Sequence, residues 1–503
     1  NLAILYKRRG DYMQAESLYL RALNTQEKLL GPENRDVGTT LNSLAVIYTD
    51  RGDYAKAESM LKRAISIQEK SRGTDNPETA RAMSNLARIY RDKGDYAQAE
   101  PLYLHALSIR EKLLGLEHPS VGGSLWELGN FYFKRRDYEK AESHYRRALA
   151  IWEKTLGPEH PDVANALNGL ALVYAAKGDI TQAVKCLTRG NAVDESNLEL
   201  NLSLGSERQK LAYLSLFSKR TDFTFWLHSI AAPNDPEALN LAFTTLLRRK
   251  GRGLDAMTDT IENFRRHATH EDNEILDELV IARSRLAAFK LKESDETNAE
   301  RYQELLDPLQ ADVEKLEVKL STRSAEFRAQ ARPVTIEAVQ SALPAASALI
   351  EFVVFTPQEP RSEKKGPPRY LAYVLGHEGR PRWADLGEAA PIDQAVNDWR
   401  SALRANRLDA KRLGREVDEK VMRPVRALLQ EGLREGPQPG SAKEDEINHL
   451  FISPDGPLNL ISFAALVDEE NRYLIERYTI SFLTSGRDLL RFQDAPSTDL
   501  SAP

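Results

Sequence analysis

The sequence has a single cysteine, Cys186, among 503 residues, so the chain cannot form an internal disulfide. One thiol fits a reducing compartment better than an oxidising one. Long hydrophobic runs are also lacking. The most apolar stretch, residues 344–355, is shorter than the roughly 20 residues that a membrane helix needs. We therefore expect a cytoplasmic protein with no membrane partner.

The chain also lacks a basic excess, because 69 Lys and Arg stand against 75 Asp and Glu, for a formal net charge of −6. This balance argues against a nucleic-acid partner. No glycine-rich phosphate loop or dinucleotide fingerprint is present, so we expect no cofactor. His267 and His270 have a spacing that could hold a metal, but no third ligand is identifiable. We expect a solvated helix end there and no metal.

The composition is otherwise that of a globular protein, with 41% hydrophobic and 29% charged residues. At roughly 100–200 residues per domain, the length implies several domains, or one domain and a repeat array. The first residue is Asn1 rather than Met. We therefore expect this chain to be a piece of a longer protein.

A Gly-Asp-Tyr triplet recurs at intervals of 42 residues. It occupies residues 10–12, 52–54 and 94–96, and returns in altered form at 136–138 and 178–180. Tyrosine and small-residue columns follow the same interval. The tyrosines are Tyr6, Tyr48, Tyr90, Tyr132 and Tyr174, and the small residues are Ala3, Ala45, Ala87, Gly129 and Ala171. Columns in one register over about 190 residues indicate a repeat array.

Each repeat unit reads as two helices. Leu41, Leu44, Ala45 and Tyr48 have helical spacing and define one apolar face. A turn at residues 51–53 ends that helix, and the apolar face of the next helix follows. Its residues are Tyr54, Ala57, Leu61, Ala64 and Ile65. Small residues let the helices approach closely, while Tyr and Leu fill the space between them.

These motifs resemble tetratricopeptide repeats in the long, 42-residue form found in kinesin light chains. The resemblance covers residues 1–190. It implies a right-handed α-solenoid with a concave groove that binds peptides or protein segments. We therefore expect a protein or peptide partner, while the sequence assigns no oligomeric state.

In tetratricopeptide domains, positions between the packing residues of the first helix face the groove. The corresponding residues here are Asn42, Ser84, Arg88, Arg91, Trp126, Asn130 and Asn168. Asn amides can bond to an extended peptide backbone as both donor and acceptor. Arg88 and Arg91 could pair with an acidic partner. The alternative is a helix face that is merely solvated.

Residues 191–332 lose the repeat but remain helical in pattern, with amphipathic stretches at 201–217 and 236–249. Apolar residues in 275–289 and 302–320 follow a 4, 3, 4, 3 spacing, which is typical of a coiled-coil seam. We expect a helical linker that contains a hairpin, with a kink at Pro308.

From about residue 333 the pattern changes to strands mixed with helices, which indicates an α/β domain over 333–503. The expected strands are 348–355, 369–375, 447–453 and 473–483. Helices are expected at 392–406 and 409–430, and another begins at 487–492.

The segments 450–458, 463–466, 473–476 and 480–483 resemble the start of a CHAT domain. This caspase-like module follows tetratricopeptide arrays in many bacterial proteins, and residues 334–355 also resemble its first strand. The expected fold class is therefore mainly α: a solenoid over 1–190, a helical linker over 191–332, and an incomplete α/β caspase-like domain over 333–503.

The CHAT resemblance implies a cysteine peptidase with a His–Cys dyad. In that family both residues lie downstream of the segments matched here, so no residue of this chain inherits a catalytic role. Cys186 lies on a repeat helix, where we expect a structural thiol. His377 and His449 flank strands, and we expect them to be loop or strand-end residues.

Two hypotheses follow. In the first, the array regulates, or recruits substrate to, a CHAT peptidase whose dyad lies beyond residue 503. In the alternative, the protein is a non-catalytic scaffold with a degenerate CHAT domain. Because the α/β part would expose unpaired strands, we also expect removal of residues after about 333 to improve solubility.

Overall fold

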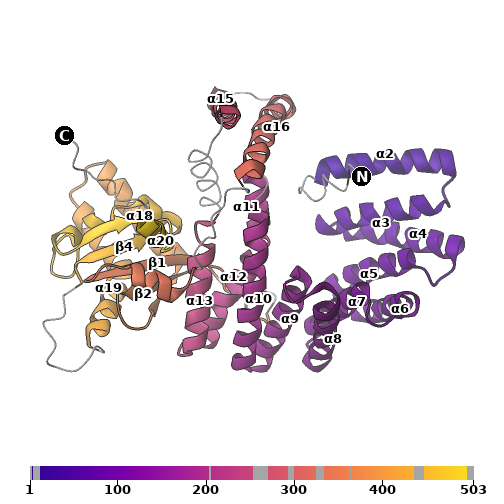
Figure 1. The fold of residues 1–503 in the computed structure, drawn as a ribbon, viewed down its shortest axis with the longest axis horizontal. Helices are drawn as coiled ribbons and strands as arrows, with labels where there is room; N and C mark the ends of the chain where they lie inside the picture. The colour runs from indigo at the N-terminus through magenta and orange to yellow at the C-terminus, as the bar shows by residue number, and fades with distance from the viewer. Residues whose placement is uncertain are drawn as a thin grey trace. The chain divides into compact units, whose positions relative to one another are not determined.

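The computed structural model describes residue 3 and residues 12–202, 206–252, 270–292, 299–324, 334–362, 364–434 and 447–494 (Figure 1). The chain divides into two compact units, residues 1–198 and 199–503. The domain boundaries that the sequence suggests at residues 190 and 332 remain predictions.

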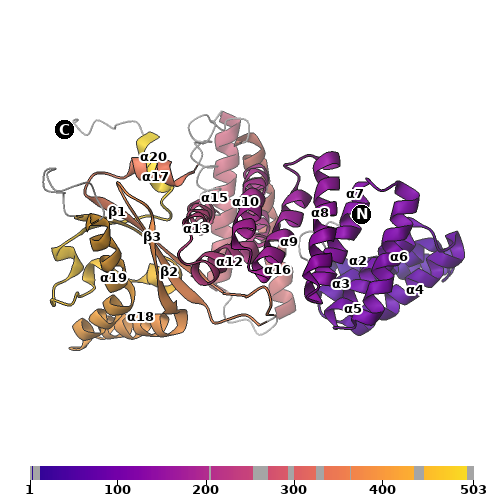
Figure 2. The ribbon, with the colours of Figure 1, turned by 90° about the horizontal axis from the view of Figure 1, so that it is seen from below.

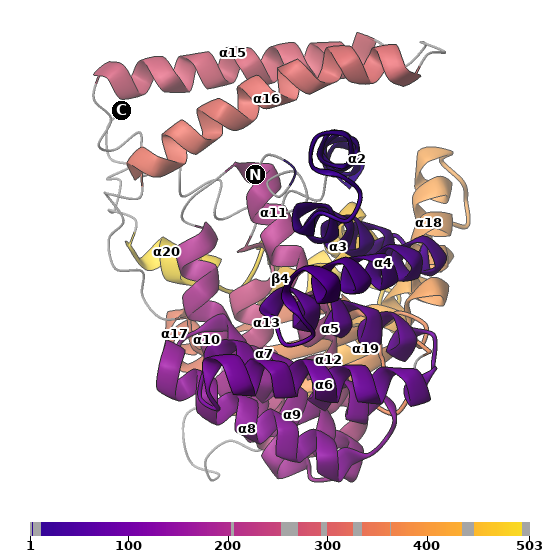
Figure 3. The same cartoon turned by 90° about the vertical axis from the view of Figure 1, so that its right-hand side faces the viewer.

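The first unit is a solenoid of paired helices, which confirms the fold expected for the repeats. Its described helices are α2 (Tyr12–Leu30), α3 (Arg35–Asp50), α4 (Tyr54–Arg72), α5 (Pro77–Asp92), α6 (Tyr96–Leu114), α7 (Pro119–Lys134), α8 (Tyr138–Leu156), α9 (Pro161–Lys177) and α10 (Ile180–Leu202). Helices α3, α5, α7 and α9 are the first helices of their units, and α4, α6, α8 and α10 are the second. Figure 3 shows helices α2 to α6 stacked one below another.

The Gly-Asp-Tyr triplet forms the turn between the two helices of a unit. Gly52 has a φ of 82°, a left-handed conformation that glycine adopts without steric cost. The side chain of Asp53 then accepts a hydrogen bond from the backbone N–H of Lys56 and caps the second helix. The triplet therefore recurs because it ends one helix and begins the next.

In the core of the solenoid, the small residues of the repeat column pack against larger side chains. Ala45 and Ala87 are fully buried, as the spacing predicts. In the next unit Gly129 takes this position because the ring of Tyr145 lies against it. A Cβ on Gly129 would be 2.6 Å from that ring, and one on Gly169 would be 2.7 Å away on the same ring.

In the second unit, helices precede the sheet. They are α11 (Glu207–Ser215), α12 (Ser218–Trp226), the π-helical turn η1 (Leu227–Ala231), α13 (Pro236–Arg249), α15 (His270–Lys292) and α16 (Ala299–Ser324). The hairpin prediction is confirmed, because Ile275 and Leu279 of α15 pack against Val313 of α16. Pro308 lies inside α16, which is assigned as one helix through this residue.

The sheet of the second unit has the strand order β3-β2-β1-β4-β5. Its strands are β1 (Ser347–Phe355), β2 (Arg369–Gly376), β3 (Arg382–Glu388), β4 (His449–Ser453) and β5 (Thr479–Phe482). β1, β4 and β5 are parallel, whereas β2 runs antiparallel to both β1 and β3. The remaining elements are α17 (Ile336–Ala342), α18 (Ala389–Arg404), α19 (Ala410–Arg434), η3 (Gly456–Leu460), η4 (Phe463–Ala465), η5 (Leu474–Glu476) and α20 (Asp488–Asp494).

Three expectations for this region were wrong in detail. The first part of the expected strand region 334–355 is helix α17, capped by the side chain of Thr335. The expected strand 473–483 begins with the 3₁₀ turn η5, and only Thr479–Phe482 pairs with β4. Strand β3 had no counterpart in the sequence prediction.

Helices cover both faces of the sheet (Figure 2). On one face, Trp399 of α18 and Val421 of α19 join the core formed with Ile350 and Phe352 of β1. On the other, the rings of Phe225 in α12 and Phe243 in α13 contact Tyr373 of β2. Helices of the expected linker therefore form one layer of an α/β/α arrangement.

None of the helices in these residue ranges combines the length and apolarity that crossing a bilayer requires.

Candidate functional site

The residues predicted to line the groove lie on α3, α5, α7 and α9. These first helices contact one another in succession. We call their shared surface, built by the seven predicted residues with Asn85 and Glu127, the first-helix face. Asn42, Ser84 and Asn168 are buried, while the other predicted residues are half-buried.

Three predicted side chains of this face have hydrogen-bond partners on neighbouring helices, whereas the amide of Asn168 donates to Ala164 within its own helix. Asn85 donates from Nδ2 to the Oδ1 atom of Asn42 at 2.9 Å. The hydroxyl of Tyr145 donates to Oδ1 of Asn130 at 2.8 Å. The indole of Trp126 donates to the carbonyl oxygen of Asn165 at 3.4 Å. The predicted residues therefore also join neighbouring helices, and only part of their hydrogen-bonding capacity remains for a ligand.

The two predicted arginines are both paired with carboxylates. Nη2 of Arg88 lies 3.5 Å from Oδ1 of Asp50, which belongs to the preceding unit. Arg91 forms an ion pair with Asp92 at 2.9 Å. These half-buried pairs hold the guanidinium groups in place on the face, because the charges are only partly screened by solvent.

Several buried polar atoms near these arginines form no hydrogen bond of good geometry in the described part of the chain, although the hydroxyl of Ser84 lies close enough to Glu127 to oppose the rise that burial causes in its pKa. They are Oγ of Ser84, Nε and Nη2 of Arg88, the hydroxyl oxygen of Tyr103, and Oε2 of Glu127. Both Tyr103 and Glu127 feel the charges of Arg88 and Arg91, so the groups lie close together. Buried polar atoms without partners are uncommon in folded proteins. We call Ser84, Arg88, Tyr103 and Glu127 the unsatisfied cluster.

Glu127 is the one carboxylate of this cluster. Burial raises the pKa of Glu127, and the nearby guanidinium of Arg110 acts in the opposite direction. Arg110 itself donates a hydrogen bond to the hydroxyl of Ser124. A half-buried acid among arginines can accept hydrogen bonds from a ligand while the arginines donate to it.

The sequence prediction missed Glu127, Tyr103 and Arg110. A signal for two of them was present in the repeat columns. Glu127 occupies the column of Ser43, Asn85 and Gly169, and Arg110 occupies the column of Gln26, Gln68 and Trp152. A charge that appears once in an otherwise neutral column marks a unit that differs from its neighbours.

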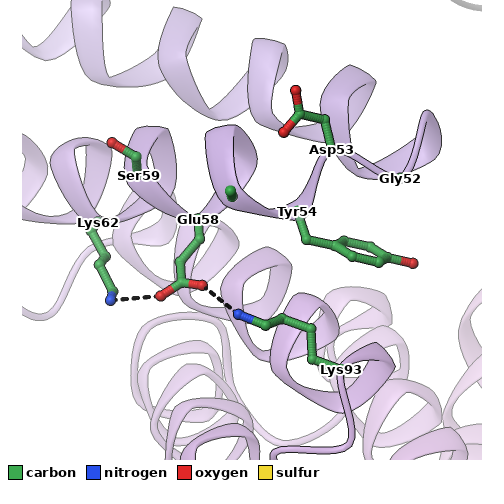
Figure 4. Close-up of a pocket in the computed structure, with 8 residues that line it drawn as sticks. Gly52, Asp53, Tyr54, Glu58, Ser59, Lys62 and Lys93 are labelled. Carbon is green, nitrogen blue, oxygen red and sulfur yellow. Dashed lines mark hydrogen bonds and ion pairs between the residues drawn. The ribbon is translucent and has the colours of Figure 1, made fainter.

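A pocket of about 750 Å³ lies elsewhere on the solenoid, beside the turn between α3 and α4 (Figure 4). Its lining residues are Gly52, Asp53, Tyr54, Ala55, Glu58, Ser59, Lys62 and Lys93. Glu58 lies between the two lysines and pairs with Lys62 at 2.7 Å and with Lys93 at 3.0 Å. Because these charges compensate one another, the pocket offers no unpaired lysine to a ligand.

Glu58 belongs to a contact that recurs in every described repeat. A glutamate of one second helix accepts from a tyrosine hydroxyl and a cationic side chain at the end of the next first helix. The sets are Glu16 with Tyr48 and Arg51, Glu58 with Tyr90 and Lys93, Glu100 with Tyr132 and Arg135, and Glu142 with Tyr174 and Lys177. We call these sets the inter-repeat clasps.

The clasps shift the acid–base properties of their members. Hydrogen bonds from Lys62, and then from Lys93, lower the pKa of Glu58 to about 2. Burial and the bond to Glu16 raise the pKa of Tyr48 to about 12. The clasps therefore depend on ionised glutamates and explain the tyrosine column of the sequence.

The surroundings of Cys186, His377 and His449 are those of structural side chains. Burial raises the pKa of the Cys186 thiol to about 11, which disfavours the thiolate that a nucleophile needs. His377 contacts the carbonyl oxygen of Leu343 through Nδ1 at 2.7 Å. His449 contacts the hydroxyl of Ser481, on the neighbouring strand, through Nε2 at 2.9 Å.

The possible metal motif cannot be placed, because His267 lies outside the described residues. Within the described ranges, no group of three or more His, Cys, Asp or Glu side chains could hold a metal ion.

Comparison with family models matches two parts of the chain. Tetratricopeptide repeat models match residues 1–70, 36–112 and 120–196. A CHAT domain model matches residues 411–503. The chain carries tetratricopeptide repeats and a CHAT domain. No curated protein matches it.

The tetratricopeptide array is also similar to solved structures. BtubC (BKLC) from P. vanneervenii is 28% identical, with 39% of this chain and 78% of that chain covered and a TM-score of 0.35. TPR-like repeats of a kinesin light chain type from Podosopora anserina are 28% identical, with 39% and 93% covered and a TM-score of 0.34. A Rap protein complexed with Competence and Sporulation Factor is 15% identical, with 65% and 74% covered and a TM-score of 0.34.

Proposed function

We propose that the first-helix face of the tetratricopeptide array binds an extended segment of a partner protein. The observation that carries the proposal is the unsatisfied cluster. Ser84, Arg88, Tyr103 and Glu127 hold buried polar atoms that form no hydrogen bond of good geometry, although Arg88 ion-pairs with Asp50 and Ser84 lies beside Glu127. Leaving such atoms poorly paired costs free energy. A bound peptide would supply the missing hydrogen bonds. Its carbonyl oxygens and acidic side chains would accept from Arg88, and its amide N–H groups would donate to Glu127.

The side chains of the face change along the array, and this change supports a segment of mixed character. Helix α5 presents Arg81, Arg88 and Arg91. Helix α7 carries the half-buried Trp126 and Phe133. We propose that an acidic part of the partner lies on α5 and an apolar part lies toward α7. Opposite charge would set the register, and apolar burial would contribute to affinity.

For the whole protein, we propose that the array regulates, or recruits substrate to, a caspase-like CHAT peptidase in the cytoplasm. The CHAT match over residues 411–503 supports a peptidase context. The alternative is a non-catalytic scaffold, in which binding by the array is the entire function. Sequence beyond residue 503 with a His–Cys dyad would support the first, and sequence without this pair would support the second.

The binding proposal is tested by selecting peptides from a random display library on the full chain and measuring the affinity of the enriched peptides. We expect acidic residues to be enriched beside apolar ones. Arg88→Met should weaken binding by about tenfold or more, because a charge-assisted hydrogen bond is lost. Raising the salt concentration should weaken binding further.

Arg147→Met is the matched control. Arg147 lies on a second helix, where it is 43% exposed and pairs with Glu111. We expect this variant to bind the peptides with unchanged affinity. If both arginine variants lost the same affinity, or if no peptide were enriched, the proposal would be wrong.

A further inference from the structure

A buried ion pair joins helix α13 to the sheet of the second unit. Glu351 lies in the middle of β1, and its side chain is fully buried. Lys250 directly follows α13, and its side chain is 12% exposed. Nζ of Lys250 lies 2.8 Å from Oε2 of Glu351. Two charges removed from water in this way are costly unless their remaining hydrogen bonds are also satisfied.

The hydrogen bonds of Lys250 are fully used. Besides Glu351, its Nζ donates to the carbonyl oxygens of Phe352 and Ser453, each at 2.7 Å. An ammonium group has three N–H donors, so none remains for solvent. Phe352 belongs to β1, and Ser453 is the last residue of β4. One lysine therefore fixes the end of α13 to two adjacent parallel strands.

The second carboxylate oxygen of Glu351 binds the turn that follows β5. It accepts a hydrogen bond from the backbone N–H of Gly486. A Cβ at this position would lie 2.5 Å from the Cδ2 methyl of Leu349 and 2.9 Å from that of Leu247, so glycine lets the turn pack closely against both leucine side chains. The turn is thus in close contact with α13 as well as with β1.

Arg487 completes the connection from the other side. Its Nη1 donates to the carbonyl oxygen of Arg248 at 2.8 Å, and its Nη2 donates to that of Lys250 at 2.6 Å. These carbonyl groups belong to the end of α13, where a helix has no internal donors for them. The turn after β5 therefore caps the helix whose lysine reaches back into the sheet.

We propose that Lys250, Glu351, Gly486 and Arg487 form a latch through which the last turn of α13 and the turn at residues 484–487 move as one unit. The bonds run in both directions between the two segments, so neither segment can shift without breaking contacts of the other. In open α/β sheets, ligands bind beyond the carboxyl ends of the strands. The turn at 484–487 follows the carboxyl end of β5, so a partner that displaced α13 would alter this edge of the sheet.

This inference concerns regulation within the second unit and does not depend on peptide binding by the array. It is tested by hydrogen exchange with mass spectrometry on the full chain. Lys250→Met keeps the length of the side chain but removes its charge and donors. We expect exchange about tenfold faster in both 244–250 and 484–490, and little change in β2 at 369–376. Lys420→Met, on the exposed side of α19, is the control and should leave all three segments unchanged.

Two further variants guard against a folding failure of Lys250→Met. Arg487→Met acts from the opposite side, and coupling is reciprocal, so it should accelerate exchange in 244–250 as well as in its own turn. Adding Glu351→Gln to Lys250→Met removes the unpaired carboxylate, and protection of 484–490 should partly return. Faster exchange confined to the mutated segment, or equal acceleration throughout the sheet, would overturn the latch.

Discussion

Arg136 stands where the other repeat turns have glycine. Its φ is 65°, a left-handed conformation that costs a residue with a Cβ about 1 kcal/mol. We expect Arg136→Gly to raise the free energy of unfolding by about 1 kcal/mol, since glycine removes this strain. Urea denaturation followed by circular dichroism measures the change.

The equivalent turn supplies the matched reverse variant. Gly94 has a φ of 79° and open space around its missing Cβ. Gly94→Arg should therefore lower the free energy of unfolding by a similar amount. Equal stability of both variants and the parent would mean that the turn relaxes to accommodate either residue.

Glu58 makes stability depend on pH at the acid side. Its pKa is lowered from the usual 4.5 to about 2 in the folded chain, so the folded state favours the ionised form. The clasp contribution is then complete above pH 4.5 and is lost as the pH falls toward 2. We expect Glu58→Gln to cost about 1–2 kcal/mol at pH 7 and much less at pH 3, measured by thermal or urea unfolding.

Glu33→Gln is the control for this pH dependence. Glu33 pairs with Lys70 across the surface, and its side chain is 61% exposed. Exposed pairs contribute about 1 kcal/mol or less, so the control should change stability only slightly at either pH. An equal loss at pH 7 and pH 3 for Glu58→Gln would contradict the role of its charge.

At the scale of the element, the helices of the array could be predicted from sequence because each unit repeats the same spacing, turn and cap. The short elements of the α/β part could not. Strand β3 shows no alternation of apolar and polar residues in Arg382–Glu388, and its pairing with β2 holds it in place. The apolar residues around η5 fit a strand pattern, but they form a 3₁₀ turn. The side chain of Glu476 stabilises this turn by accepting a hydrogen bond from the backbone N–H of Tyr473.

Helix α7 offers a sensitive test of packing between elements. Gly129→Ala would place a methyl group 2.6 Å from the ring of Tyr145. The ring has no room to move away, because Gly169 also lies against it. We expect a loss of about 1–3 kcal/mol in the free energy of unfolding, as in other overpacked cores.

Gly123→Ala in the same helix should have the opposite effect. No atom lies within 4 Å of the position of its Cβ. Alanine is the better helix former, so this variant should gain about 0.5–1 kcal/mol. If Gly129→Ala gained as much stability as Gly123→Ala, contact with Tyr145 would not limit the packing of α7.

At the scale of the whole molecule, the repeat interval predicts which residues lie on the first helices of the units but not which partners their side chains have. The columns that contain Asn42, Trp126 and Asn130 follow from the repeat interval. Their partners, Asn85, Asn165 and Tyr145, depend on which atoms meet when helices from neighbouring units pack. These contacts depend on how the helices pack in three dimensions, so the spacing of residues along the chain cannot predict them.

The packing of α12 and α13 on the sheet argues against the expectation that removing residues after about 333 improves solubility. Ending the chain at residue 332 would remove β1 and β2 and uncover Phe225 and Phe243, whose rings contact those strands. We now expect this shortened chain to aggregate more than the full chain, because a large apolar surface would be exposed. Light scattering of the purified chains at equal concentration measures the difference.

A chain that ends at Leu202, the last residue of α10, should remain soluble. It keeps the whole described solenoid and none of the helices that pack on the sheet. If the chain ending at residue 332 were as soluble as this shorter one, the layer formed by α12 and α13 would be stable without the sheet.

The inter-repeat clasps have a consequence for how such arrays change during evolution. Every described clasp between neighbouring units uses a glutamate, a tyrosine and a cationic side chain at the same repeat positions. After a duplication or loss of 42 residues, neighbouring units would therefore still carry side chains that can form the clasp. The number of repeats can thus change without substitutions at the contacts between units. The unsatisfied cluster follows no such rule, because Glu127 and Arg88 occur in single units. Copying a unit would extend the solenoid, whereas only substitution within a unit would give the new copy a different ligand.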